Sequence, residues 1–126
     1  MEIKELTRAE EQVMQELWRL KKAFVRDIIE QMDDPRPAYN TVSTIIRILE
    51  TKGFVGHESF GKSHRYFPKI SKDDYKDFAA GKLLSGYFEN SAQNMLSFFL
   101  QEKKLSLKEA DELFKIIEKA KKEQKF

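Results

Sequence analysis

The stretch from residue 38 to residue 55, AYNTVSTIIRILETKGFV, constrains the fold more than any other part of the chain. On a helix that turns about 100° per residue, four of its aliphatic side chains fall within one arc of roughly 100°; these are Val42, Ile45, Ile46 and Leu49. The opposite side carries slim polar groups and one cation: Asn40, Thr44, Arg47 and Thr51, with Ser43 at the margin. The pattern predicts a helix over 39–52 that ends at Gly53, with one buried face and a low outer face.

The segments around this helix predict a winged helix-turn-helix. Thr7 and Glu10 form a capping-box pair at the start of a first amphipathic helix. A second, shorter helix carries Val25 to Met32, and DDPRP at 33–37 ends it because proline disfavours helix at the preceding residue. After Gly53, the runs FVGHES and HRYFPK flank FGKS at 60–63 and predict a β-hairpin. Three helices and a hairpin are the parts of a winged DNA-binding domain. We expect this domain to span residues 1–70.

The outer face of helix 39–52 has the chemistry of a major-groove reader. Asn pairs with adenine, Arg pairs with guanine, and Thr offers a hydroxyl or a methyl group to thymine. The leading expectation is therefore double-stranded operator DNA as the partner. Two alternatives use the same residues: a polar surface helix without a ligand, and a winged-helix module that binds another protein.

Charge is distributed unevenly along the chain. The net charge is only +2, but residues 36–70 carry six basic and two acidic side chains, while residues 1–35 are net negative. All six arginines precede residue 70. The planar guanidinium of arginine can bind phosphate or guanine through two hydrogen bonds, which the lysine ammonium does less well. The local excess at 36–70 therefore favours an anionic partner for this part of the chain.

The hairpin tip offers cations to a phosphate backbone. Lys62 and Arg65 lie at or beside FGKS, and we expect the wing at 57–66 to follow DNA phosphates. A two-residue turn at 60–61 would place His57 directly opposite His64, with Glu58 nearby. Adjacent strand residues point to opposite faces, so a third metal ligand is not assured. We therefore predict no metal site.

Residues 71–126 predict a separate helical domain. Ser71 with Asp74, and Ser106 with Glu109, have capping-box spacing, and Asn90-Ser91 interrupts the helical pattern between them. The last helix is expected to turn its apolar residues inward; these are Leu113, Phe114, Ile116, Ile117 and Ala120. The segment has more apolar groups than short isolated helices can hide, so we expect a dimerisation arm and a homodimer.

Several classes of protein are disfavoured. The chain lacks GxGxxG, Walker, HExxH and GxSxG motifs, so we expect no enzyme and no cofactor. It has no cysteine, no run of about 18 apolar residues and no signal-peptide core. A cytoplasmic protein without membrane insertion is the simplest expectation.

Three segments together resemble a known family. LTRAEEQVMQELW at 6–18, YNTVSTIIRILETKGFV at 39–55 and GKSHRYFPKIS at 61–71 resemble the BlaI/MecI/CopY group of bacterial repressors, and LSLKEADEL at 105–113 extends the likeness. The resemblance implies a winged-helix domain, a dimerisation arm and control of antibiotic-resistance or copper-export genes. It carries DNA contact onto the following residues: Asn40, Thr41, Ser43, Thr44, Arg47, Lys62 and Arg65.

The sequence departs from this family at two places. Ile48 stands where the family often has arginine. The β-lactam repressors are inactivated by cleavage of an Asn-Phe bond, which a membrane sensor-transducer or its protease initiates. The matching pair here is Phe98–Phe99, in which only Phe99 agrees. The copper branch uses a cysteine cluster, which this chain lacks.

Overall fold

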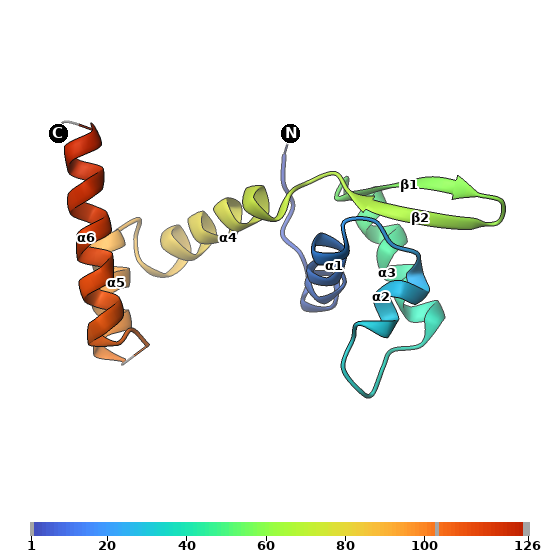
Figure 1. Cartoon of the computed structure of the whole chain (residues 1–126), viewed down its shortest axis with the longest axis horizontal. Helices are drawn as coiled ribbons and strands as arrows, with labels where there is room; N and C mark the ends of the chain where they lie inside the picture. The colour runs from blue at the N-terminus through green and yellow to red at the C-terminus, as the bar shows by residue number, and fades with distance from the viewer. Residues whose placement is uncertain (1, 103, 125–126) are drawn as a thin grey trace. The chain divides into compact units, whose positions relative to one another are not determined.

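The computed structural model describes residues 2–102 and 104–124. The described chain is mainly helical and has a single β-hairpin, as predicted (Figure 1). The elements in order are α1 (Arg8–Leu20), α2 (Val25–Glu30), α3 (Tyr39–Thr51), β1 (Val55–Phe60), β2 (Ser63–Pro68), α4 (Lys72–Tyr87), α5 (Ala92–Gln101) and α6 (Leu107–Gln124). Contacts divide the chain into one unit of residues 1–80 and another of residues 81–126.

Side-chain caps start three of the helices at the predicted positions, and those of α1 and α6 are complete capping boxes. At α1 the Thr7 hydroxyl accepts from the Glu10 backbone N–H, and the Glu10 carboxylate accepts from the Thr7 N–H at 2.9 Å. Ser71 accepts from the backbone N–H of Asp74 at 3.0 Å before α4. Ser106 accepts from the backbone N–H of Glu109 at 3.1 Å before α6. Each side chain satisfies a backbone donor that has no partner within the helix.

Helix α3 ends as the sequence predicts, within one residue. Gly53 has φ +86°, a conformation that strains any residue with a Cβ. The Phe54 N–H donates to the Leu49 carbonyl at 2.9 Å and the Gly53 N–H donates to the Glu50 carbonyl at 3.0 Å. This pair of bonds is the Schellman motif, and it turns the chain directly from α3 into β1.

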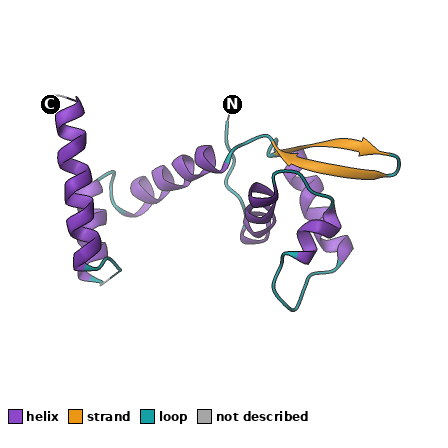
Figure 2. Ribbon diagram, in the orientation of Figure 1, coloured by secondary structure: helices purple, strands orange, loops and turns teal. Residues whose placement is uncertain are grey.

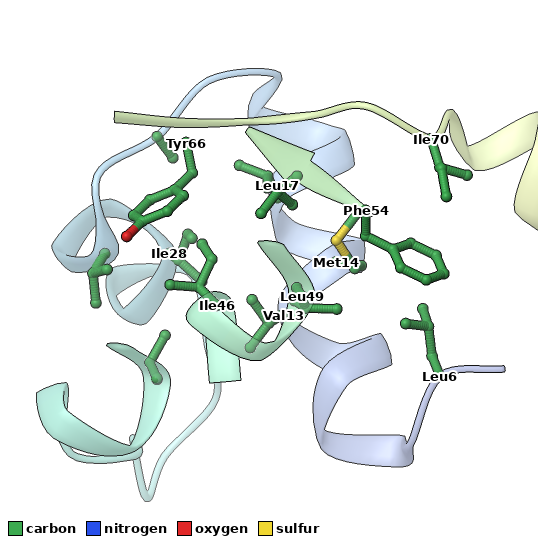
Figure 3. Packing of buried hydrophobic residues seen from close by; sticks show 14 of the residues in the cluster. Leu6, Val13, Met14, Leu17, Ile28, Ile46, Leu49, Phe54, Tyr66 and Ile70 are labelled. Carbon is green, nitrogen blue, oxygen red and sulfur yellow. The ribbon is translucent and has the colours of Figure 1, made fainter. Parts of the chain in front are cut away.

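One hydrophobic core joins α1, α2, α3 and the base of the hairpin. Its centre consists of nine side chains with almost no exposed surface: Val13, Met14, Leu17, Ile28, Val42, Ile46, Leu49, Phe54 and Val55. Figure 3 shows Met14 and Leu17 of α1 packed toward Ile46 and Leu49 of α3, with Phe54 beside them. This packing fixes the orientation of α3, since every fully buried α3 side chain belongs to the core.

The hairpin differs from the predicted register. Phe60 pairs with Ser63 and His57 pairs with Tyr66, so the two-residue turn is Gly61-Lys62 and not 60–61. The prediction that His57 lies directly opposite His64 is therefore wrong. The reason is glycine: favoured two-residue hairpin turns need positive φ at their first position, and Gly61 supplies φ +62°. Strand β2, drawn in orange together with β1 in Figure 2, also forms a bridge with Ala23. The Ala23 N–H donates to the Tyr66 carbonyl at 2.9 Å.

The first turns of α4 belong to the unit of residues 1–80. The Tyr75 hydroxyl accepts from the Leu6 N–H at 3.0 Å, and its ring packs on Trp18 and Phe54. The Trp18 indole N–H donates to the Ile70 carbonyl at 2.9 Å. The division between the units thus falls inside α4, while the boundary at 70/71 stays a prediction about separate folding.

In the unit of residues 81–126, apolar side chains remain exposed on the single chain. Leu107 is 84% exposed, Tyr87 80%, Ile116 63% and Phe114 61%, and Ile117 is also exposed. The prediction that the last helix turns these residues inward is therefore wrong for one chain, apart from half-buried Leu113. The side chain of Ala120 lies outside the described part. Among the described residues, no helix has both the length and the apolar composition to cross a bilayer.

Candidate nucleic-acid interface

Helix α3 has the two faces that the sequence predicts. Val42, Ile46 and Leu49 are fully buried and Ile45 is half-buried. The outward side carries six exposed residues: Asn40, Thr41, Thr44, Arg47, Ile48 and Thr51. At about 100° per residue, Tyr39, Ser43 and Arg47 lie along the flank of this side nearer the hairpin. The outer face of α3 is thus free for a partner along its whole length.

Hydrogen bonds to the helix backbone hold three side chains of this face close to the helix surface. The Thr44 hydroxyl donates to the Asn40 carbonyl at 2.9 Å, and the Thr51 hydroxyl donates to the Arg47 carbonyl at 3.1 Å. Arg47 Nε donates to the Ser43 carbonyl at 3.2 Å, which lays the side chain along its own helix. The terminal nitrogens of Arg47 have no hydrogen bond within the described part of the chain, so they are available to a ligand.

A groove of about 630 Å³ lies between α2, α3 and the hairpin tip. Tyr39, Ser43 and Arg47 form its α3 wall. The remaining lining comes from the start of α2 and from the hairpin: Phe24, Val25, Arg26, Asp27, Phe60, Lys62, Ser63, His64 and Tyr66. The wing and the flank of α3 nearer the hairpin therefore share one continuous hollow.

The groove is electropositive. Arg26, Arg47 and Lys62 line it, and none of them forms an ion pair with another described residue. Asp27 is the one acidic lining residue, and its carboxylate accepts from the backbone N–H of Phe24 at 2.9 Å. Three cations held without partners around a concave surface attract an anion of similar breadth.

The two histidines stack on the hairpin. Their rings lie 4.2 Å apart, with 10° between the ring planes. This contact is diagonal across the strands, because His57 pairs with Tyr66 and His64 pairs with Ser59. The predicted neighbour Glu58 is not their partner: His57 Nδ1 lies 2.6 Å from the Glu50 carboxylate of α3. Among the described residues, no group of three His, Cys, Asp or Glu side chains could hold a metal ion.

Glu50 also acts on Tyr66, at the floor of the hairpin. Burial raises the pKa of the Tyr66 phenol, and the Glu50 carboxylate raises it further. A tyrosine is protonated at neutral pH even without this shift, so the Tyr66 phenol is a hydrogen-bond donor.

Arg65 is not among the residues that line the groove. It pairs across the strands with Glu58 at 3.3 Å and lies over the Phe60 ring, 4.8 Å from the centroid. Lys22 binds the same carboxylate at 3.3 Å, and this hydrogen bond, with help from Arg65, lowers the pKa of Glu58. Arg65 Nε is buried with no partner in the described structure. Its charge is thus already partly neutralised.

The structure brings only some of the expected contact residues together. Ser43, Arg47 and Lys62 meet in the groove, and Asn40 and Thr44 lie on the adjoining outer face. Thr41 lines a different hollow between α1, α3 and the loop at 31–37. Phe98 and Phe99 lie on α5 in the other unit, where the Phe98 ring packs on Phe88 at 5.6 Å.

Sequence reasoning missed several lining residues, of which Arg26 and Tyr39 matter most. Arg26 lies on the exposed side of a six-residue helix that has too few turns for a clear amphipathic pattern. The local sequence around a cation on such a helix does not indicate whether the cation belongs to a binding site. Only the packing of α2 beside the hairpin, through the Ala23–Tyr66 bridge, brings Arg26 near Lys62.

Comparisons with known proteins agree with this geometry. Residues 6–119 match the family profile described as penicillinase repressor. The chain is 26% identical over 124 residues to the penicillinase repressor of Bacillus licheniformis, which covers 98% of this chain and 97% of that one. It is 27% identical over 116 residues to the methicillin resistance regulatory protein MecI of Mammaliicoccus sciuri, covering 91% and 94%.

A solved structure has the same fold as the first unit. The solution structure of the DNA-binding domain of the repressor BlaI matches with a TM-score of 0.51 and 25% identity, covering 59% of this chain and 92% of that one. The predicted winged helix is thereby confirmed. With a family profile that spans most of its length, this chain belongs to the penicillinase repressor family.

Proposed function

We propose that this chain is a homodimeric transcriptional repressor that reads a palindromic operator with α3 in the major groove. The observation that carries the proposal is the groove of Arg26, Arg47 and Lys62 beside the low outer face of α3. The cations neutralise phosphate, while the slim side chains approach base edges. The relatives are named as repressors and regulators, and the matched domain is named as DNA-binding.

In this proposal each part of the surface has its own task. Asn40 and Arg47 offer bidentate contacts to adenine and guanine, and Thr44 lies between them on the outer face. Lys62, at the hairpin turn, and Arg26, on α2, bind phosphates and set the register of the domain on the duplex. Repression follows if the bound protein excludes polymerase from the promoter.

The homodimer is proposed from the exposed apolar residues of the second unit. Tyr87, Leu107 and Phe114 are each more than half exposed on the single chain. Large exposed apolar side chains mark interaction surfaces when they gather in a patch, and a second copy of the chain would cover these residues. Two copies of α3 would then read half-sites about one helical turn apart.

Release from DNA is proposed to follow cleavage of the Phe98–Phe99 bond, initiated by a membrane sensor-transducer or its protease. The bond lies within α5, so a protease needs local unwinding of that helix. Cutting there separates part of α5 and all of α6 from the first unit. Induced cells should contain a fragment that ends at Phe98, and intact protein under full induction would contradict this step.

A mobility-shift experiment with the full chain tests the proposed function. The duplex is the region upstream of the chain's own gene, compared with an unrelated duplex of equal length. We expect a specific complex that survives excess unrelated DNA. Absence of any shift at low salt, where nonspecific binding is strongest, would contradict DNA binding and favour a protein-interaction module.

A further inference from the structure

Ile48 is an exposed aliphatic side chain on a face otherwise built for an anion. It is 42% exposed and lies outside the hydrophobic core. An apolar side chain gains nothing from contact with phosphate, and DNA offers one apolar group in the major groove, the C5-methyl of thymine. This inference rests on the proposed function, since it concerns what the DNA-facing helix reads.

Two threonines extend the apolar surface around Ile48. Thr44 and Thr51 lie four residues before it and three residues after it, so all three fall on one side of α3. Both threonine hydroxyls donate to backbone carbonyls of the preceding turn. Because each oxygen is held against the helix, the methyl group is the part of each threonine that faces outward. We call Thr44, Ile48 and Thr51 the methyl stripe.

The surroundings of the methyl stripe indicate its occupant. Arg47 is next to Ile48 in sequence but lies about 100° away around the helix, on the flank that lines the groove of Arg26 and Lys62. The cations therefore gather on one flank of α3 and the methyl stripe lies along its outer side and other flank. A helix in the major groove meets phosphates along its edges and base edges along its outer side.

We propose that the methyl stripe reads thymine methyl groups in each half-site, with Ile48 as the principal specificity-determining residue. When the full chain selects binding sites from random duplexes, each half-site should carry thymine at one or two fixed positions. Packing Ile48 against the thymine methyl excludes water from both groups, which favours thymine over cytosine or a purine at that position. Thr44 and Thr51 contribute smaller contacts to neighbouring bases.

Replacing single thymines by deoxyuridine tests the proposal, because this change removes only the C5-methyl. The full chain is titrated with selected duplexes by fluorescence anisotropy at one salt concentration. For the thymine that Ile48 contacts, we expect about fourfold weaker binding per half-site, equivalent to about 0.8 kcal/mol, the burial of one methyl group. Thymines outside the two half-sites should tolerate the replacement and serve as internal controls.

Protein variants show whether Ile48 senses the methyl. Ile48→Ala should bind the thymine duplex about as weakly as the wild type binds the deoxyuridine duplex, and it should not distinguish the two. Ile48→Val should retain part of the discrimination. Thr44→Ser keeps the hydroxyl that donates to the Asn40 carbonyl and deletes only the methyl. The variants should fold, because Ile48 and Thr44 are exposed helical residues outside the core.

The outcomes separate this inference from the proposed function. If the wild type binds selected sites but is indifferent to every thymine-to-deoxyuridine change, the methyl stripe does not read DNA. If Ile48→Ala keeps the full preference for thymine, another residue reads the methyl, and the assignment to Ile48 is wrong. If the chain binds no duplex at low salt, the proposed function fails and this inference fails with it.

Discussion

At the scale of single residues, Arg47 combines a guanidinium suited to guanine with a hydrogen bond to its own helix. Its Nε donates to the Ser43 carbonyl at 3.2 Å, so the guanidinium is fixed relative to α3 before any ligand arrives. A guanidinium group that is already oriented loses less conformational entropy on binding than a freely rotating side chain does. The flank of α3 that lines the groove therefore presents a preorganised donor pair.

Arg47→Ala is expected to weaken operator binding by about 1–3 kcal/mol, or roughly five- to 150-fold, if Arg47 makes a bidentate contact with guanine. Arg47→Lys is the matched control: it keeps the charge and loses the fork, so it should restore nonspecific affinity but little specificity. Equal operator affinity for Arg47→Ala and the wild type, measured by anisotropy, would remove Arg47 from the residues that read bases.

Lys62 is expected to bind phosphate and therefore to act alike on all DNA sequences. Lys62→Ala should weaken operator and unrelated duplexes by the same factor and reduce the slope of log affinity against log salt by about 0.9 per subunit. Lys76→Ala is a suitable control, since Lys76 is an exposed lysine on α4 that does not line the groove. An unchanged salt slope for Lys62→Ala would contradict a phosphate-bound wing.

At the scale of elements, a partly buried ion pair ties α1 to the end of α3. Lys52 Nζ lies 2.7 Å from Glu10 Oε1, and that oxygen also accepts from the Thr7 N–H. Glu10 is only 4% exposed. Burial opposes the charge on Glu10, but the hydrogen bonds from Lys52 and Thr7 outweigh it and hold the pKa of the carboxyl below its ordinary 4.5.

The sign of this shift predicts a pH dependence of stability. A lowered pKa in the folded state contributes stability above the ordinary value of 4.5, and the contribution is lost as pH falls through the lower folded value. At pH 7, Glu10→Gln should reduce the free energy of unfolding by about 1–3 kcal/mol, because a buried charged hydrogen bond with Lys52 is lost. In urea titrations the difference should shrink toward pH 3; a constant difference from pH 7 to pH 3 would contradict this role.

Local sequence signals predicted the elements well and the groove poorly. The side-chain caps at Thr7, Ser71 and Ser106 and the C-cap at Gly53 are contacts within a few residues, so the sequence alone defines them. The hairpin register was predicted one residue off because the choice of Gly61 as first turn residue depends on its positive φ. The groove depends on the bridge between Ala23 and Tyr66, which no local pattern specifies.

At the scale of the whole molecule, exposed apolar residues in the unit of residues 81–126 favour binding to another protein chain that would bury them. The homodimer predicted from the sequence is one way to cover them, and avidity is its functional consequence. Two linked winged-helix domains bind a palindrome about 10²–10⁴ times more tightly than one domain does. Loss of the dimer should therefore abolish repression even if each winged helix stays folded.

Phe114→Lys tests the dimer. Phe114 is 61% exposed on the single chain, so a lysine there should leave the chain folded while disrupting an apolar interface. Sedimentation should show the wild type as a dimer at micromolar concentration and the variant as a monomer at least tenfold higher. Glu112→Ala, on the opposite side of α6, should remain dimeric. A wild type that sediments as a monomer would contradict the proposed assembly.

The central claim is that one continuous surface, from the outer face of α3 to the hairpin tip, binds DNA. Backbone amide chemical shifts of the full chain, recorded by NMR with and without a selected operator duplex, test it directly. The largest changes should fall on residues 40–51 and 60–64 and on Arg26, with little change along the α1 surface opposite α3. Changes concentrated on α5 and α6, or absent from α3 in a saturated complex, would contradict the claim.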